Sequence, residues 1–432
     1  MLRADGHWFC DEAGRTLLFR GVNLGGDSKV PTTPDGATHH PEGFFDHRMV
    51  SFVGRPFPLA EATEHLSRLK SWGLTFLRFL VTWEAIEHAG PGLYDTAYLD
   101  YVEQVLRIAG EMGFTTFIDP HQDVWSRFTG GDGAPGWTLE AVGFDMTHFA
   151  ETCAAIVHQT HGDPFPRMVW PTNAGRLAAA TMFTLFFGGN DFAPRVLVDG
   201  EPVQEYLQRH YVDAILQVVQ RARDVPGVVG YDTFNEPSHG YIGWKDLRGF
   251  GSRLRIDLQP TPLQSFALGD GMAQEVEAWG MSIAGGRLRG RRTVNQEGVH
   301  AWKEGHPCIW RDQGVWGMAD GGEPELLVPD YFCRHEGRDV DFESDYLVPF
   351  IRRYAQAVHA VDPKALIFVE GEPESLPPSM GDCPEQGIVS APHWYDAVQL
   401  LLKRPGRWLG YDSIRNRVVL GPVAVRRSFA WQ

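Results

Sequence analysis

Residues 227–237 read Gly-Val-Val-Gly-Tyr-Asp-Thr-Phe-Asn-Glu-Pro, and this stretch decides the predicted fold. Its first half is an apolar strand, which must end before Pro237 because proline has no amide hydrogen to donate to a sheet. A carboxylate at the tip of a buried parallel strand lies where (β/α)8 barrels place their catalytic groups. Glu236 is therefore a candidate catalytic residue, and the Asn235 amide beside it can bind a sugar hydroxyl. The alternative is a solvated glutamate at the start of a helix, because so short a motif is not specific.

Strand-like and helix-like segments alternate on both sides of this stretch. Apolar strands are predicted at residues 19–24, 75–80, 115–119, 365–370 and 388–396. Amphipathic helices are predicted at residues 59–72, 98–112, 203–223 and 345–361. This alternation predicts the α/β class, with a parallel sheet covered by helices. A hairpin over residues 5–20, with its turn at Ala13-Gly14, precedes the first strand.

Two segments are longer than a strand–helix unit requires, and we expect them to be insertions in a single domain that covers residues 1–432. The first covers about residues 136–203, with helices expected over 138–160 and 177–187, and the second covers about residues 240–340. Insertions on a barrel gather over its active face. The apolar segment at 177–187 would either line a cleft for a lipid or sterol, or lie in the core beneath a long loop.

Composition narrows the range of partners and compartments. The formal net charge of −16 argues against nucleic acid or an anionic membrane as a partner. The cysteines are odd in number and form no C-x-x-C pair, and the first residues are too polar for a signal peptide. We therefore expect reduced thiols and a cytoplasmic location.

Several charged residues stand within predicted strands or just beyond them. Arg78 lies among the apolar residues of the strand at 75–80, so it must be paired, because an unpaired buried charge is too costly. His121 and Asp123 follow the strand at 115–119 and would bind a metal ion, bind a sugar or make structural polar contacts. Lys29, just beyond the first strand, either contacts a substrate or is a solvated loop lysine.

The motifs, taken in chain order, resemble those of family 5 glycoside hydrolases over nearly the whole chain. The shared features are the N-terminal hairpin followed by Arg20-Gly21-Val22-Asn23, then Arg78, Trp83-Glu84, Asn235-Glu236-Pro237 and His393-Trp394-Tyr395. His121-Gln122-Asp123, with an aromatic residue two positions on, is close to the third strand of endoglycoceramidases and their relatives. Residues 301–316 resemble an insert of the branch that includes steryl-β-glucosidases and glucosylceramide-cleaving enzymes.

The resemblance implies an incomplete (β/α)8 barrel of the TIM type, in which strands one to six are present. It implies retaining hydrolysis of the β-glucosidic bond of a glycolipid, either a steryl β-glucoside or glucosylceramide, with no cofactor and no metal ion. Glu236 would be the acid/base catalyst, and the glucose would be bound by Lys29, Arg78, His121, Asp123, Asn235, His393 and Tyr395. In relatives the tyrosine of the last motif contacts the nucleophilic carboxylate. A lipid substrate also implies transient contact with a membrane surface.

The chain departs from the family pattern after the His-x-Tyr motif. Retaining glycosidases need a second carboxylate as nucleophile. The family places it at the end of strand seven, yet residues 397–432 contain no glutamate. We therefore expect the chain to stop before strands seven and eight and any C-terminal β-sandwich, and to be inactive as given. Glu370 and Glu372, after the fifth strand, are the only substitutes that we nominate.

Two functions from other classes stay open. The first is a non-catalytic homologue that binds a glycolipid or carbohydrate without turnover. The second is a metal-dependent barrel hydrolase, which would contain stoichiometric zinc and use His121, Asp123 and His393.

Overall fold

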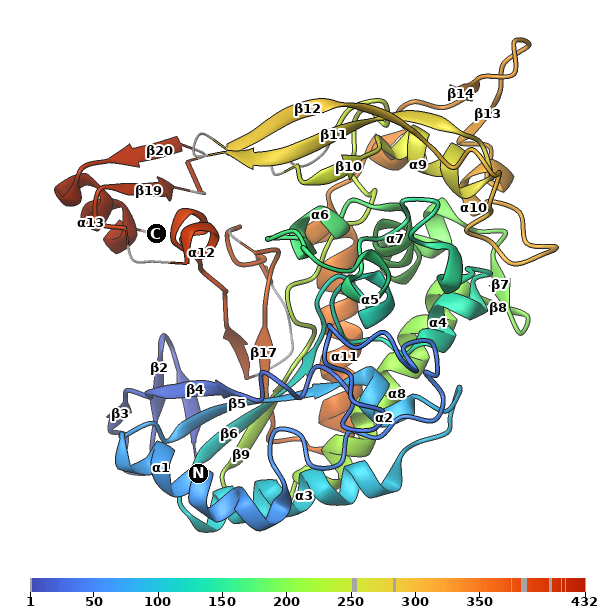
Figure 1. Cartoon of the computed structure of the whole chain (residues 1–432). Helices are drawn as coiled ribbons and strands as arrows, with labels where there is room; N and C mark the ends of the chain where they lie inside the picture. Colours follow the sequence, from blue (N-terminus) through green and yellow to red (C-terminus); the bar gives the residue numbers. More distant parts are fainter. Residues whose placement is uncertain are drawn as a thin grey trace.

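The structure, a computed structural model, describes residues 2–250, 255–282, 285–373, 375–381, 387–403, 406–412, 414–415 and 417–431. At its centre is a six-stranded sheet in which every neighbouring pair of strands is parallel. The strands follow their chain order across the sheet, namely β4 (Gly21–Leu24), β5 (Phe76–Thr82), β6 (Thr115–His121), β9 (Val228–Asp232), β17 (Leu366–Val369) and β18 (Ile388–Ser390). The predicted α/β class and parallel sheet are therefore confirmed (Figure 1).

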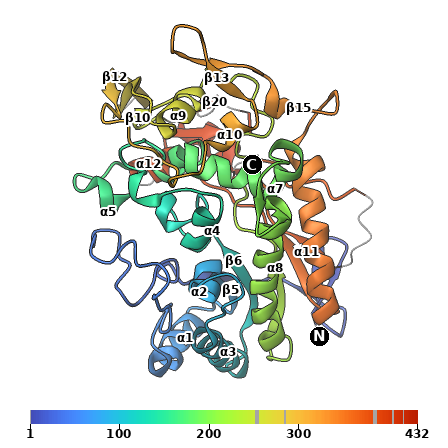
Figure 2. The same ribbon diagram turned by 90° about the vertical axis from the view of Figure 1, so that its right-hand side faces the viewer.

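Helices connect these strands and cover the sheet. In chain order, α1 (Ala62–Ser71) precedes β5 and α2 (Trp83–Glu87) follows it. The helix α3 (Thr96–Glu111) precedes β6, α8 (Val203–Ala222) precedes β9, and α11 (Val348–Val361) precedes β17. The Asp95 side chain caps α3 by accepting a hydrogen bond from the Tyr98 amide at 3.0 Å. Buried residues of α3 recur at three- and four-residue spacing, which is one helix face. α8 packs against both α3 and α11 (Figure 2).

A small antiparallel sheet precedes the central one. β1 (Arg3–Asp5) pairs with β2 (Trp8–Cys10), and β2 pairs with β3 (Thr16–Leu17). Gly14, in the turn between β2 and β3, has a φ of 76°, a conformation that favours glycine. The hairpin predicted over residues 5–20 corresponds to β2 and β3, and β1 is a strand that the pattern did not predict.

The segment after β6 does not form the single helix predicted over residues 138–160. It is divided into α4 (Gly136–Ala141), a 3-10 turn at Met146–His148 and α5 (His158–His161). Gly143 and Cys153 have φ values of 92° and 55°. Because these values are incompatible with a right-handed helix, they end the helical turns.

The helix predicted at 177–187 is present as α7 (Leu177–Phe192), which follows the short α6 (Trp170–Asn173). α7 is buried along nearly its whole length and packs against α8. This helix is therefore core beneath the insertion. The short pair β7 (Leu197–Val198) and β8 (Glu201–Pro202) then leads into α8.

The segment between β9 and β17 forms small antiparallel sheets, which lie at the top of Figure 1. The largest contains β10 (Asp257–Gln259), β11 (Gln274–Ser282) and β12 (Gly285–Val294), with α9 (Pro262–Gly269) between its first two strands. After α10 (Ile309–Asp312) come two pairs, β13 (Trp316–Met318) with β14 (Pro324–Leu326) and β15 (Arg334–His335) with β16 (Arg338–Asp339).

Beyond β18 the chain forms what we call the C-terminal unit, residues 397–431. The predicted strand at 388–396 is shorter than expected, because β18 ends at Ser390 and residues 391–396 run without regular structure to the unit. The unit contains α12 (Ala397–Leu402), the hairpin of β19 (Leu409–Asp412) and β20 (Arg417–Leu420), and α13 (Pro422–Trp431). Among the described residues, no helix has the length and apolar character needed to cross a bilayer.

Candidate active site

Glu236 lies just beyond the C-terminal end of β9, and two side chains hold its carboxylate. Glu236 Oε1 accepts a hydrogen bond from the Tyr395 hydroxyl at 2.8 Å and lies 2.7 Å from His393 Nδ1. The backbone of Glu236 has a φ of 40°, which costs free energy in any residue other than glycine. Its surroundings, and not its local preference, therefore fix the position of this residue.

Arg78, on β5, supplies some of those surroundings. Its Nη2 donates to Asn235 Oδ1 at 2.6 Å and to Glu370 Oε1 at 2.7 Å, and it lies 3.0 Å from Asp119 Oδ2. The pairing predicted for this buried arginine is confirmed. Burial alone would lower the pKa of Arg78, but the carboxylates of Asp119 and Glu370 raise it above its usual range. The charged guanidinium thus fixes the Asn235 amide next to Glu236.

Glu370 follows β17, and only 1% of its side chain is exposed. Its Oε1 contacts Arg78 Nη2 and also His393 Nε2, the latter at 3.0 Å. Its Oε2 accepts a hydrogen bond from the backbone amide of Glu236 at 2.9 Å. Both oxygens are therefore occupied, and Glu370 anchors the strained backbone of Glu236. Glu372 is the other residue nominated as a replacement for the nucleophile. Its Oε1 accepts a hydrogen bond from the backbone amide of His239 at 3.1 Å.

His393 bridges two carboxylates, with Nδ1 at Glu236 and Nε2 at Glu370. Burial lowers the pKa of His393, but its hydrogen bonds with these carboxylates raise it to about 9. At neutral pH it is therefore an imidazolium that donates to both of them. Tyr395, which the resemblance places against the nucleophile, donates to Glu236 here. Burial and the Glu236 charge raise the pKa of Tyr395, so its hydroxyl keeps its proton.

A second group of predicted residues lies at the end of β6. Lys29 Nζ donates to Asp123 Oδ2 at 2.5 Å and lies 3.6 Å from Asp132 Oδ2. His121 Nδ1 is 2.8 Å from Asp119 Oδ2, and His121 Nε2 is 3.6 Å from Asp123 Oδ2. Burial lowers the pKa of His121, but the surrounding carboxylates raise it to about 10. Because Asp119 also contacts the arginine of β5, the two groups form one continuous charged network.

Asp132 is a member of this network that the sequence analysis missed. It lies in the turn Gly130-Gly131-Asp132-Gly133, and its backbone pairs with that of Asp123. A Cβ atom on Gly131 would lie 1.8 Å from the Asp123 carbonyl oxygen, so only glycine permits this approach. The three glycines that surround Asp132 in the sequence were the feature that could have identified it. Burial raises the pKa of Asp132 to about 7 despite the nearby Lys29 charge.

The metal-site interpretation requires His121, Asp123 and His393 to share one ion. His121, Asp123 and Asp132 do offer ligand atoms within 4.8 Å of one another. However, the Lys29 ammonium already contacts the carboxylates of Asp123 and Asp132. His393 contacts the carboxylates of Glu236 and Glu370 instead of this group. The structure therefore does not gather His121, Asp123 and His393 around one ion.

The protonated histidines make the stability of the fold depend on pH. The pKa of His393 is about 9 in the folded chain against 6.5 unfolded, so its contribution is full below pH 6.5 and is lost as pH rises through 9. We expect the free energy of unfolding to fall by roughly 1–3 kcal/mol over this range. Urea denaturation at several pH values measures it. His393→Gln should show a smaller decline, and an unchanged decline would contradict the bridge.

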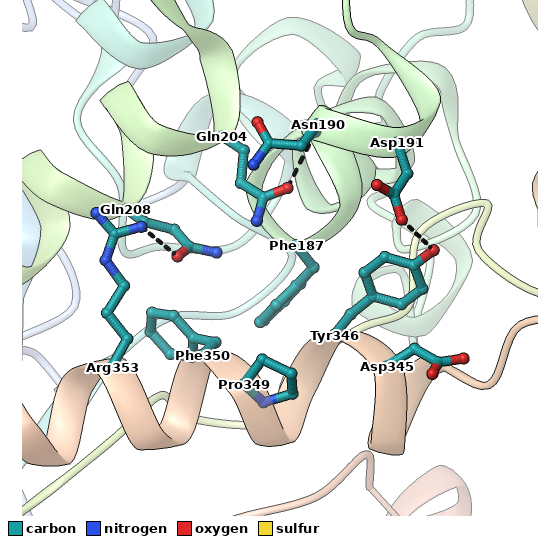
Figure 3. A pocket seen from close by; sticks show the side chains of 10 residues that line it. All are labelled: Phe187, Asn190, Asp191, Gln204, Gln208, Asp345, Tyr346, Pro349, Phe350 and Arg353. Atoms are coloured by element: carbon teal, nitrogen blue, oxygen red, sulfur yellow. Dashed lines mark hydrogen bonds between the residues drawn. The ribbon is translucent and has the colours of Figure 1, made fainter. Parts of the chain in front are cut away.

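A separate pocket lies between α7, α8 and α11 (Figure 3). It has a volume of about 260 Å³ and is lined by Phe187, Asn190, Asp191, Gln204, Gln208, Asp345, Tyr346, Pro349, Phe350 and Arg353. Its polar groups bond to one another, for example Arg353 Nη1 to Gln208 Oε1 at 3.1 Å and the Tyr346 hydroxyl to Asp191 Oδ2 at 2.9 Å. None of the candidate catalytic residues lines it, and we assign it no role.

Comparison with known proteins places this chain among glycosidases. The chain is 43% identical to a glucosylceramidase of Rhizopus delemar over 423 residues, which cover 95% of this chain and 62% of that protein. It is 35% identical to an ergosteryl-beta-glucosidase of Saccharomyces cerevisiae over 461 residues, covering 95% of this chain and 60% of that protein. A crystal structure of Cryptococcus neoformans sterylglucosidase 1 superimposes with a TM-score of 0.92 at 35% identity, covering 99% of this chain and 66% of that one.

The chain thus spans about 60% of the length of these curated relatives. The sequence profile of Cellulase (glycosyl hydrolase family 5) matches residues 37–253, which include β5, β6, β9 and Glu236. By its sequence profile, its relatives and its fold, the chain belongs to glycosyl hydrolase family 5.

Proposed function

We propose that this chain contributes the acid/base catalyst and the glucose-binding residues for retaining hydrolysis of a glycolipid β-glucoside, first a steryl β-glucoside and second glucosylceramide. The observation that carries the proposal is the Glu236 carboxylate, held by His393 and Tyr395 at the end of a parallel strand. The names of the similar proteins support the substrate class. We also propose that the six parallel strands are the first six of a (β/α)8 barrel, which their order in the sheet supports.

In the proposed reaction Glu236 acts twice. As an acid it protonates the aglycone oxygen while the bond from that oxygen to the anomeric carbon breaks. A second carboxylate, roughly 5–5.5 Å away, attacks the anomeric carbon and forms a glycosyl ester. As a base Glu236 then takes a proton from the water that hydrolyses this ester. His393 and Tyr395 fix the direction in which the Glu236 carboxylate points during both steps.

The charged network at the end of β6 supplies the proposed glucose subsite. Sugar hydroxyls both donate and accept hydrogen bonds, so they need acceptors and donors side by side. Asp123 provides the acceptor, and Lys29 and His121 provide donors around it. Burial raises the pKa of Asp123, but the His121 hydrogen bond and the Lys29 charge hold it well below its usual range. This carboxylate therefore stays ionised at neutral pH.

Binding of a glucose-configured iminosugar tests the glucose subsite without requiring turnover. We expect isothermal titration calorimetry to detect one bound molecule per chain. Asp123→Asn should weaken binding about 10- to 100-fold, because a hydrogen bond to a charged group contributes about 1.5–3 kcal/mol. Asp191→Asn, in the separate pocket, is the matched control and should leave the affinity unchanged. Equal affinities of the parent and Asp123→Asn would refute the assignment.

A further inference from the structure

Three carboxylates lie together where β6, β9 and β17 end. The register of the sheet pairs Ile118 with Tyr231, so Asp119 and Asp232 follow side by side on β6 and β9. Glu370 follows β17, the strand on the other side of β9. One carboxylate oxygen from each of these three acids lies within 4.8 Å of the others, and all three residues are buried. Three negative charges at this distance in the interior need cations beside them.

Cations contact two of these acids but not the third. Arg78 contacts the carboxylates of both Asp119 and Glu370, and each of these two acids also has a protonated histidine beside it. Asp232 forms no ion pair with any described residue. A metal ion is a poor substitute for the missing cation, because the Arg78 guanidinium already contacts two of its three ligands. The charge of Asp232 is therefore the one that the cluster leaves uncompensated.

The two oxygens of Asp232 have different surroundings. Oδ1 accepts a hydrogen bond from the Thr233 amide at 2.7 Å. Oδ2 is buried and makes no hydrogen bond with any described residue. An ionised carboxylate here would be a buried charge with one donor and no counter-ion, whereas a carboxylic acid is neutral and can donate from Oδ2. Burial and the two neighbouring carboxylates raise the pKa of Asp232 well above its usual range.

Two tyrosines of the covering helices also lie near Asp232. They are Tyr211 of α8 and Tyr354 of α11, and both interact with its charge. Burial raises the pKa of each tyrosine well above its usual range, so both hydroxyls keep their protons. The Tyr211 hydroxyl donates to the Thr233 carbonyl oxygen at 2.8 Å. Neither tyrosine carries a positive charge, so neither compensates an ionised Asp232.

We propose that Asp232 is a neutral carboxylic acid at neutral pH and that, as a positioning residue, it acts on Glu236 through Glu370. Glu370 Oε2 accepts one hydrogen bond, from the Glu236 amide, and a carboxylate oxygen can accept a second. The proton on Asp232 Oδ2 is directed to this acceptor. Loss of the proton would place another negative charge against Glu370 and repel its carboxylate from the amide that it anchors. The positioning role rests on the proposed function of Glu236, whereas the presence of the proton does not.

Infrared spectroscopy of the 432-residue chain detects the proton, because the carbonyl stretch of a protonated carboxylic acid is separate from the bands of ionised carboxylates. At about pH 8 we expect this band in the parent chain, and Asp232→Asn should remove it. Asp132→Asn should leave the band in place, although burial raises the pKa of Asp132 to about 7. Glu370→Gln should shift the band, because it replaces the group that accepts the proton. Absence of the band in the parent chain, or a band that Glu370→Gln leaves unshifted, would overturn the proposal.

The pH dependence of unfolding counts the same proton independently. Because the pKa of Asp232 is raised in the folded chain, the folded state keeps a proton that the unfolded state releases above pH 3.8. The stabilising contribution of this proton is full below that pH and is lost as pH rises. Asp232→Asn carries no such proton. The unfolding constant of the parent chain, divided by that of Asp232→Asn, should therefore rise about tenfold per pH unit between about pH 5 and pH 8.

The matched control is Asp224→Asn, because the Asp224 side chain is 82% exposed. The ratio of its unfolding constant to that of the parent chain should stay constant over the same pH range. A constant ratio for Asp232→Asn would show that Asp232 is ionised in the folded chain and would overturn the proposal. Neither measurement uses a sugar, so a failed iminosugar titration would refute the proposed function while these measurements still decide the state of Asp232.

Discussion

Arg78→Met is expected to lower the free energy of unfolding by about 3–5 kcal/mol. The guanidinium of Arg78 is the cation shared by the buried carboxylates of Asp119 and Glu370. Methionine fills a similar volume but removes the one cation that lies against both carboxylates, so Asp119 keeps only the contact with His121 and Glu370 only the contact with His393. Two buried carboxylates then share less positive charge, and removing one partner of a buried ionic network costs more than the intact contact contributes. Urea denaturation followed by tryptophan fluorescence gives the difference.

The matched control is Arg68→Met on α1. Arg68 pairs with Glu64 four residues earlier at 2.7 Å, but both side chains are exposed. Its loss should change the free energy of unfolding by less than about 1 kcal/mol, because exposed pairs contribute little. If Arg78→Met cost no more than Arg68→Met, the three-way contact at the centre of the site would be wrong.

The 432-residue protein is expected to release glucose from a steryl β-glucoside roughly 10⁴-fold or more slowly than a retaining glycosidase that has both carboxylates, because catalytic partners act as a unit. The carboxylate that shares His393 with Glu236 is Glu370, which is 1% exposed and has both oxygens bonded. It is therefore not placed to attack an anomeric carbon. A coupled assay of glucose release measures the rate.

Added azide distinguishes a missing nucleophile from a misplaced acid. Azide attacks the anomeric carbon, the aglycone leaves with the proton of Glu236, and an inverted glucosyl azide is formed. We expect azide to raise the rate with the parent chain but not with Glu236→Gln, since the acid contributes roughly 10²- to 10⁴-fold. Full-rate hydrolysis without azide would show that the nucleophile lies within these residues. Glu370→Gln and Glu372→Gln would then identify it.

Local patterns predicted where single side chains stand but not what they contact. The position of Glu236 follows from an apolar strand ended by a proline, and that of Arg78 from a charge inside an apolar strand; both depend on neighbours in sequence. The contact between Glu370 and the Glu236 amide joins residues 134 positions apart. Such a contact follows from strand order in the sheet, which no local pattern specifies.

The errors in the prediction have equally specific causes. A helix was predicted over residues 138–160 from periodicity, yet Gly143 and Cys153 adopt positive φ values that end it. Asp132 was missed because an acid in a glycine-rich turn resembles an ordinary loop. The formal net charge of −16 is a sum over the whole chain. It therefore does not reveal that residues 397–432 contain seven basic residues and one acidic residue.

The burial of α7 also bears on how the protein is synthesised. Fourteen of its sixteen residues are buried, so this helix has no face that suits water. During translation, α7 leaves the ribosome before α8 and α11, the helices that cover it in the finished fold. Until those helices arrive, the nascent chain exposes a continuous apolar segment of the kind that chaperones bind and that promotes aggregation. Growing the expression host more slowly and supplying it with additional chaperone should therefore increase the yield of folded protein.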